Sequence, residues 1–187
     1  MGGPWVVEPR PASGSPSNEA SIPDPRVTMI FRICAIGNEI PDVGEVIDAD
    51  GMFLLPGIID PEVHFREPGA DHKEDLHSGS CAAAAGGVTS FLDMPNNTPP
   101  VITRQRMFEK KQLAAEKSVV NYGFFMGATP DNLEELNAVE NVCGIKIFMG
   151  ASTGDLLVDD PDVLEKIFAN GSRLIAVHAE AESVLQA

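Results

Sequence analysis

Apolar segments recur along most of the chain at intervals of about 30 residues, and this spacing limits the folds that the sequence can adopt. Each segment is short, and the later ones are apolar on both faces, as the strands of a covered parallel sheet are. Stretches of helical length lie between them. The segments begin near Ile58, Val88, Val120, Ile145 and Leu174. Successive βαβ units therefore predict an α/β fold, either a doubly wound sheet or part of a (β/α)8 barrel.

Four helices are expected between these strands, over residues 73–85, 103–117, 131–140 and 161–170. Thr103 and Asp131 are residue types that cap helix N-termini, and Glu134 would complete a capping box with Asp131. Pro161 suits a first helical position, whereas Gly86 suits a helix end.

The chain begins differently. Residues 1–25 contain six of the fifteen prolines, with Gly, Ser and Asn between them, so residues 1–27 are expected to be disordered. From residue 28 to residue 56, short apolar runs at 32–37 and 45–48 are typical of brief strands. The repeating β/α pattern then occupies residues 57–187.

Composition excludes several classes of function. The net charge of −15 disfavours nucleic-acid binding, because the protein would repel a phosphate backbone. No apolar run approaches the roughly 18 residues of a membrane span, and no secretory signal opens the chain. Cys34, Cys81 and Cys143 are too widely spaced for a cysteine zinc site or a disulfide framework. We expect a soluble, cytoplasmic protein.

Polar residues alternate with apolar ones in the first strand of the repeating pattern. Because side chains alternate between the faces of a strand, Asp60, Glu62, His64 and Arg66 share one face. An edge strand with one face in water explains this pattern equally well. A functional interpretation gains weight because the later strands carry similar exceptions.

Those exceptions are a lysine, a histidine and an asparagine. Lys146 lies inside an apolar strand, where burial favours a neutral amine that can add carbon dioxide to form a carbamate, a ligand for metal ions. His178 ends another apolar strand, and Asn96 lies in the loop after a third. Each has a structural alternative. Lys146 could extend its amine to the barrel rim, His178 could be a hydrogen-bonded core residue, and Asn96 could belong to a simple turn. Together with His64, however, these residues fall at the strand ends where barrel enzymes place catalytic groups.

Residues 56–69, PGIIDPEVHFREPG, resemble the dihydroorotase signature of the amidohydrolase superfamily. Further segments resemble that family in the same order along the chain, at residues 84–89, 94–96, 144–150 and 176–180. The later motifs are shared with hydantoinases and allantoinases.

The resemblance implies a fold and a set of site residues. Residues 57–187 would form about the first five strands of a (β/α)8 TIM barrel, and residues 28–56 part of a small β-sandwich before it. His64 and His178 would bind one or two Zn²⁺ ions, with a carboxylated Lys146 bridging them. Arg66 and Asn96 would hold the carboxylate of the substrate.

The activity implied by the resemblance is the reversible opening of a cyclic amide, with dihydroorotate as substrate and pyrimidine synthesis as its setting. Family members carry a further histidine ligand and a general-base aspartate at positions that correspond here to residues beyond 187. We therefore expect residues 1–187 alone to be inactive.

One residue departs from the family pattern. The family has His-x-His on the first strand, where this sequence has Glu62 and His64. Glutamate can bind a divalent metal, but we expect Glu62 to be a weak ligand or none. This departure favours one alternative, a non-catalytic subunit supporting aspartate transcarbamoylase. A hydantoinase or allantoinase is another, because the later motifs are shared with those enzymes. A homo-oligomer is also compatible with the sequence.

Overall fold

The computed structural model describes residues 5–10, 30–36, 51–53, 55–150, 156–170, 173–180 and 184. The chain forms two compact units, Met1–Pro56 and Gly57–Ala187. No helix of the described residues is long and apolar enough to cross a membrane.

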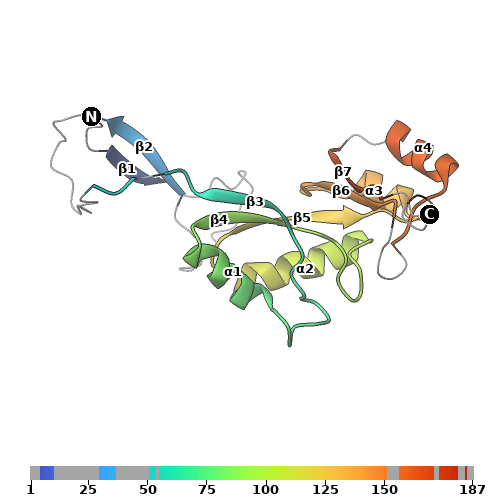
Figure 1. The fold of residues 1–187 in the computed structure, drawn as a ribbon, viewed down its shortest axis with the longest axis horizontal. Coiled ribbons are helices and arrows are strands. Elements are labelled where there is room, and N and C mark those ends of the chain that lie inside the picture. Colours follow the sequence, from blue (N-terminus) through green and yellow to red (C-terminus); the bar gives the residue numbers. More distant parts are fainter. Residues whose placement is uncertain are drawn as a thin grey trace, which may run out of the picture. The chain divides into compact units, whose positions relative to one another are not determined.

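In the first unit, β1 (Trp5–Arg10) and β2 (Ile30–Ile36) pair as antiparallel strands (Figure 1). Strand β2 corresponds to the run expected at 32–37, whereas the run at 45–48 lies outside the described residues. Strand β1 lies within residues 1–27, so the disorder expected there does not hold for Trp5–Arg10. Tryptophan and two β-branched valines favour an extended backbone in spite of the prolines around them.

The second unit alternates strands and helices throughout its described residues (Figure 1). Its strands are β3 (Ile58–Val63), β4 (Val88–Asp93), β5 (Asn121–Gly127), β6 (Gly144–Phe148) and β7 (Ile175–His178). Its helices are α1 (Leu76–Ala85), α2 (Arg104–Lys117), α3 (Leu133–Ala138) and α4 (Pro161–Asn170).

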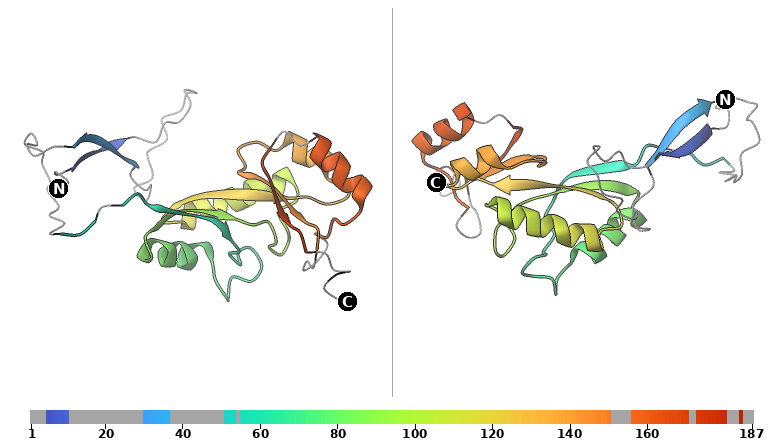
Figure 2. Two further views of the ribbon diagram at one scale, coloured as in Figure 1. Left: turned by 45° about the horizontal axis from the view of Figure 1, so that its top comes forward. Right: turned by 180° about the vertical axis from the view of Figure 1, so that it is seen from behind.

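The strand order decides between the two architectures that the spacing allowed. All five strands are parallel, and their order in the sheet is their order in the chain, β3-β4-β5-β6-β7. A doubly wound sheet would reverse its order at a switch point. This sheet does not reverse and curls along its length (Figure 2). The fold is therefore part of a (β/α)8 barrel, as the sequence predicted.

Helices α1 and α2 cover one face of β3, β4 and β5 (Figure 1). The core between these layers contains Phe91 and Phe124 from the strands and Met107 and Ala114 from α2. Each of these four side chains is at most 2% exposed. This packing fixes the ends of β3, β4 and β5 relative to one another.

Two helix starts differ from those expected. Helix α1 begins at Leu76 rather than residue 73, because the Asp75 carboxylate accepts from the amide of Ser78 at 2.7 Å and forms a capping box with that residue. Helix α3 begins at Leu133 without a side-chain cap, so the cap predicted at Asp131 is wrong. The Asn132 side chain instead bonds to the amide of Thr129, the carbonyl of Ile102 and the carbonyl of Gly127 at the end of β5.

Three other predicted helix ends are confirmed, whereas α3 ends at Ala138 rather than at residue 140. The Thr103 hydroxyl caps α2 by accepting from the amide of Arg106 at 3.3 Å, and Gly86 ends α1. Pro161 is the first residue of α4.

Candidate active site

Three of the residues singled out from the sequence lie at the carboxyl ends of parallel strands, and a fourth, Lys146, lies in the middle of its strand. His64 follows β3, Asn96 lies in the loop after β4, Lys146 belongs to β6, and His178 is the last residue of β7. In a (β/α)8 barrel the catalytic groups converge on this face. The candidate site is therefore spread over four strands of one sheet.

Glu62 and Lys146 form an ion pair that links β3 to β6. Lys146 Nζ lies 3.0 Å from Glu62 Oε1 and donates a hydrogen bond to it. Lys146 is buried, with 3% of its surface exposed, whereas the Glu62 side chain is 56% exposed. The hydrogen bond and positive charge of Lys146 lower the pKa of the Glu62 carboxyl. The buried lysine predicted from the sequence is therefore present, and it has a carboxylate partner.

His64 and Asn96 are in direct contact. His64 Nδ1 and Asn96 Oδ1 are 2.7 Å apart, and because that oxygen only accepts, Nδ1 carries the proton. The lone pair of His64 is then on Nε2, which lies 3.9 Å from Glu62 Oε1. The asparagine thus sets the tautomer that leaves Nε2 able to bind a metal ion.

His178 offers a second imidazole nitrogen of the same kind. Its Nε2 atom is buried and has no hydrogen-bond partner among the described residues; Glu180 Oε2 is 3.4 Å away as an ion-pair contact. His178 is paired in register with Phe148, whose ring centre lies 6.2 Å from the imidazole. A buried nitrogen without a partner needs an explanation, and a missing metal ion would supply one.

Arg66 is exposed, and no hydrogen bond or ion pair to the described residues holds its guanidinium. Its backbone carbonyl accepts from the amide of Ala70 at 2.9 Å, which fixes the main chain there. The side chain is therefore available to a ligand and is not brought into contact with Asn96.

The donor types suit a divalent metal, although the present arrangement is not a closed metal site. Across the described ranges, no three His, Cys, Asp or Glu side chains are grouped closely enough to hold an ion. Two imidazole nitrogens and a carboxylate are nevertheless a donor set that zinc prefers. The feature that opposes binding is Lys146, because its ammonium group already pairs with the Glu62 carboxylate.

The sequence analysis missed three buried polar residues behind the site. Asp93 ends β4, Asn97 follows Asn96, and Lys110 lies in α2 between the buried residues Met107 and Ala114. Lys110 Nζ lies 2.7 Å from Asp93 Oδ2. A lysine in the apolar stripe of a helix was the signal that could have revealed the cluster.

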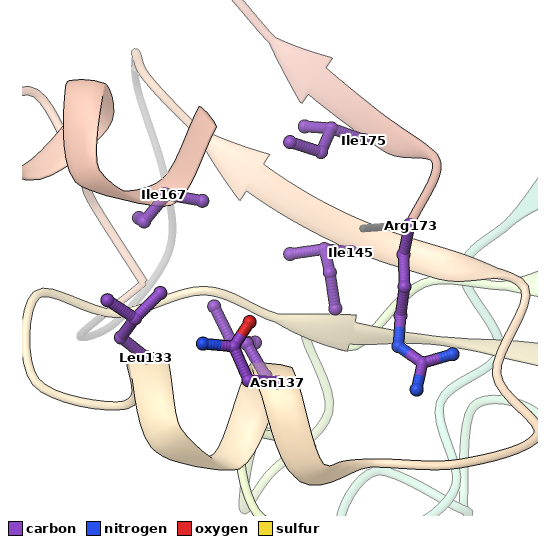
Figure 3. A pocket seen from close by; sticks show the side chains of 7 residues that line it. Leu133, Asn137, Ile145, Ile167, Arg173 and Ile175 are labelled. Carbon is purple, nitrogen blue, oxygen red and sulfur yellow. The ribbon is translucent and has the colours of Figure 1, made fainter. Parts of the chain in front are cut away.

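A small pocket between α3, α4, β6 and β7 lies apart from these residues (Figure 3). Arg173 at its edge donates to the carbonyl of Val139. Its lining is mostly aliphatic, so we interpret it as imperfect packing between the helices and the sheet. The labelled residues around it are Leu133, Asn137, Ile145, Ile167, Arg173 and Ile175.

Comparisons with known proteins agree with this geometry. A sequence profile described as the amidohydrolase family matches residues 53–171. The chain is 43% identical over 162 residues to a dihydroorotase of Methanosarcina mazei, covering 82% of this chain and 35% of that protein. It is 40% identical over 158 residues to an allantoinase of Deinococcus radiodurans, covering 80% of this chain and 35% of that protein.

Solved structures give the same result. The L-hydantoinase of Arthrobacter aurescens aligns with a TM-score of 0.73 and 28% identity, covering 86% of this chain and 40% of that protein. A D-hydantoinase aligns with a TM-score of 0.67 and 30% identity, over 86% of this chain and 39% of the other. The chain spans about a third of the length of the curated relatives that it matches.

Proposed function

The chain belongs to the amidohydrolase family, and we propose on that premise that the protein containing it hydrolyses cyclic amides, with dihydroorotate as its main substrate. The observation that supports this proposal most strongly is that His64, Asn96 and His178 lie at the carboxyl ends of three parallel strands, with Lys146 on a fourth strand between them. The setting that we propose is pyrimidine synthesis in the cytoplasm.

His64 and His178 would be the principal ligands of a Zn²⁺ ion through their Nε2 atoms. A bound zinc ion supplies a water of lowered pKa and polarises the ring carbonyl of the substrate. Asn96 keeps His64 in the tautomer that such binding requires. Glu62 would be a weak ligand, because its carboxylate is already the partner of Lys146.

Lys146 is the residue that would carry a carbamate. As an ammonium ion it is paired with Glu62 at 3.0 Å. A carbamate at the same place would set two anions side by side, and only a cation between them would offset that repulsion. Carboxylation of Lys146 is therefore expected to accompany metal binding rather than precede it.

Arg66 and Asn96 would hold the carboxylate of dihydroorotate. A guanidinium matches a carboxylate with two parallel hydrogen bonds, and no described residue occupies that of Arg66. The Oδ1 atom of Asn96 is used by His64, so its amide nitrogen is left to donate to the substrate. An anionic substrate would explain an exposed cationic side chain two residues after His64.

Rates on dihydroorotate, hydantoin and allantoin test this proposal in the full-length protein. Arg66→Ala should lower kcat/KM for dihydroorotate by roughly 10- to 100-fold, the loss of a charge-assisted contact. Arg104→Ala is the matched control, because Arg104 is exposed on α2 and pairs with Glu135. The proposal fails if the wild-type protein does not turn over dihydroorotate.

A hydantoinase or allantoinase is a second candidate. The allantoinase of Deinococcus radiodurans is about as similar to this chain as the dihydroorotase is. Uncharged cyclic amides need no cationic clamp, so this candidate predicts that Arg66→Ala leaves the preferred substrate almost unaffected.

A non-catalytic subunit is the third candidate, and the Glu62–Lys146 ion pair favours it. The pair occupies both side chains with each other, and it requires no metal. Such a subunit would support a partner such as aspartate transcarbamoylase. It predicts less than one-tenth of an equivalent of bound zinc in the purified full-length protein and no turnover of any of the three amides.

A further inference from the structure

Phe65 follows His64 in the chain, and its backbone amide and carbonyl are both hydrogen-bonded to buried side chains. Its amide donates to Asp93 Oδ1 at 3.0 Å, and its carbonyl accepts from Asn97 Nδ2 at 3.0 Å. Its ring packs edge-on against Phe91, with the ring centres 4.7 Å apart. Phe65 therefore has little freedom to move or rotate.

Lys110 connects the two side chains that hold Phe65. Its Nζ atom lies 2.7 Å from Asp93 Oδ2, 2.6 Å from Asn97 Oδ1 and 3.3 Å from the carbonyl of Met94. The contacts with Asn97 and Met94 are hydrogen bonds, whereas the contact with Asp93 is an ion pair. The ring of Phe124 covers the same nitrogen at 4.9 Å. The side chains of Asp93, Lys110 and Asn97 thus form one cluster, and two of them, Asp93 and Asn97, bind the backbone of Phe65.

The cluster is deeply buried. Asp93 is 0% exposed and Lys110 is 1% exposed. Burial raises the pKa of the Asp93 carboxyl and lowers that of the Lys110 amine, and each charge partly offsets the effect on the other. Apolar residues of similar volume often stabilise a core as well as a buried ion pair does. The presence of charges here therefore indicates a need for directional contacts.

His64 and Asn96, which form a hydrogen bond with each other, are each adjacent in sequence to a residue that belongs to the cluster or is bound by it. His64 precedes Phe65, and Asn96 precedes Asn97. Asn97 also donates to the carbonyl of Glu67 at 3.0 Å, which fixes the chain on the other side of Arg66. The cluster thus holds the main chain on both sides of the site residues after β3.

We infer that Asp93, Lys110 and Asn97 are positioning residues, which hold the segment after β3 so that His64 meets Asn96 in one fixed geometry. The significance of His64 as a ligand rests on the proposed function, whereas the positioning itself does not. Lys110 is the residue on which the arrangement depends, because it alone contacts both of the other members.

Hydrogen exchange in the full-length protein tests this inference. Lys110→Met keeps the length of the side chain and removes its charge and donors. It should speed exchange of the Phe65 amide at least tenfold, alter the ¹⁵N shifts of the His64 imidazole, and weaken Zn²⁺ binding by about 10- to 100-fold. Lys111→Met is the control, because the hydrogen bond of this neighbouring lysine within the described part of the chain goes to the carbonyl of Glu140, so all three readouts should stay unchanged.

Asn97→Ala keeps the Asp93–Lys110 pair but removes the donors to Phe65 and Glu67 and the acceptor for Lys110 Nζ, so it decides the question if Lys110→Met does not fold. It should speed Phe65 exchange and shift the His64 signals in the same direction. The inference would be overturned if a folded variant kept the wild-type exchange rate of the Phe65 amide and the wild-type His64 signals. It would also be overturned if the Phe65 amide of the unmodified protein exchanged as fast as in an unfolded chain. A protein that binds no zinc and opens no cyclic amide contradicts the proposed function instead, since Phe65 exchange requires neither.

Discussion

At the residue scale, the unusual feature of the site is that a glutamate occupies the first ligand position of the family pattern. Glu62 is close enough to His64 to share an ion, at 3.9 Å, but it is closer to Lys146, at 3.0 Å. Its charge is the partner of a buried ammonium group, and in the proposed function that role would compete with binding a metal ion. Substitutions at this position separate the two.

Glu62→His should strengthen zinc binding, and Glu62→Ala should retain it. Imidazole is the neutral ligand of the family pattern and would leave Lys146 without an anionic partner, so we expect at least a tenfold lower Kd for Zn²⁺. Chelator competition with the full-length protein measures this change. Glu134→His on the exposed surface of α3 is the control for a new histidine alone. Loss of metal in Glu62→Ala would show that Glu62 is a principal ligand.

The Glu62 carboxyl should titrate below its ordinary pKa of 4.5, because Lys146 stabilises its charged form. The folded-state pKa then lies below the unfolded one. The ion pair therefore adds stability above the unfolded pKa and loses that contribution as the pH falls through the folded value. Carboxyl ¹³C shifts measured without metal should show a midpoint that rises toward 4.5 in Lys146→Met. An unchanged midpoint in that variant would remove Lys146 as the cause.

At the scale of elements, α1 is held close to the segment after β3 by a glycine. A Cβ atom on Gly79 would lie 2.7 Å from the ring of Phe65, a distance that requires the helix or the ring to move. The residue therefore sets the distance between α1 and the same Phe65 that the buried cluster holds.

Gly79→Ala should lower the free energy of unfolding by about 1 to 3 kcal/mol, the usual effect of overpacking in a core. Gly86→Ala is the matched control, because its Cβ would find no atom nearer than 3.6 Å. Urea denaturation of both variants in the full-length protein compares the two. Equal stability of the two variants would mean that α1 adjusts freely.

The sequence predicted the elements better than it predicted the contacts between them. All five strands of the second unit began within one residue of the expected positions, because most strands of a parallel sheet are apolar runs that are visible in the sequence, and β3 differs only in its alternating Asp60 and Glu62. The start of α3 was misplaced because Asn132 bonds to the carbonyls of Ile102 and Gly127, which no local pattern reveals. The pairing of Asp93 with Lys110 was missed for the same reason, since each residue alone looks like an ordinary strand or helix position.

At the scale of the whole molecule, β3 and β7 are the edge strands of the five-stranded sheet, each with one partner in the described part of the chain. Ile59 on β3 is 61% exposed and Val177 on β7 is 44% exposed. An exposed edge with apolar side chains is a template for pairing with another chain. The net charge of −15 opposes such pairing, because two copies repel each other.

A polypeptide of residues 1–187 should therefore self-associate, and more strongly in salt. At an ionic strength near 0.02 M repulsion between copies acts over about 20 Å, whereas near 0.5 M it is confined to about 4 Å, so the edges can meet. Ile59→Lys should reduce association, because a charge on an edge strand opposes pairing. Phe108→Lys is the control, since that side chain is 57% exposed but lies on α2. Sedimentation velocity distinguishes the outcomes: a monomer at both salt concentrations, or an equal effect of the two substitutions, would show that the strand edges do not drive association.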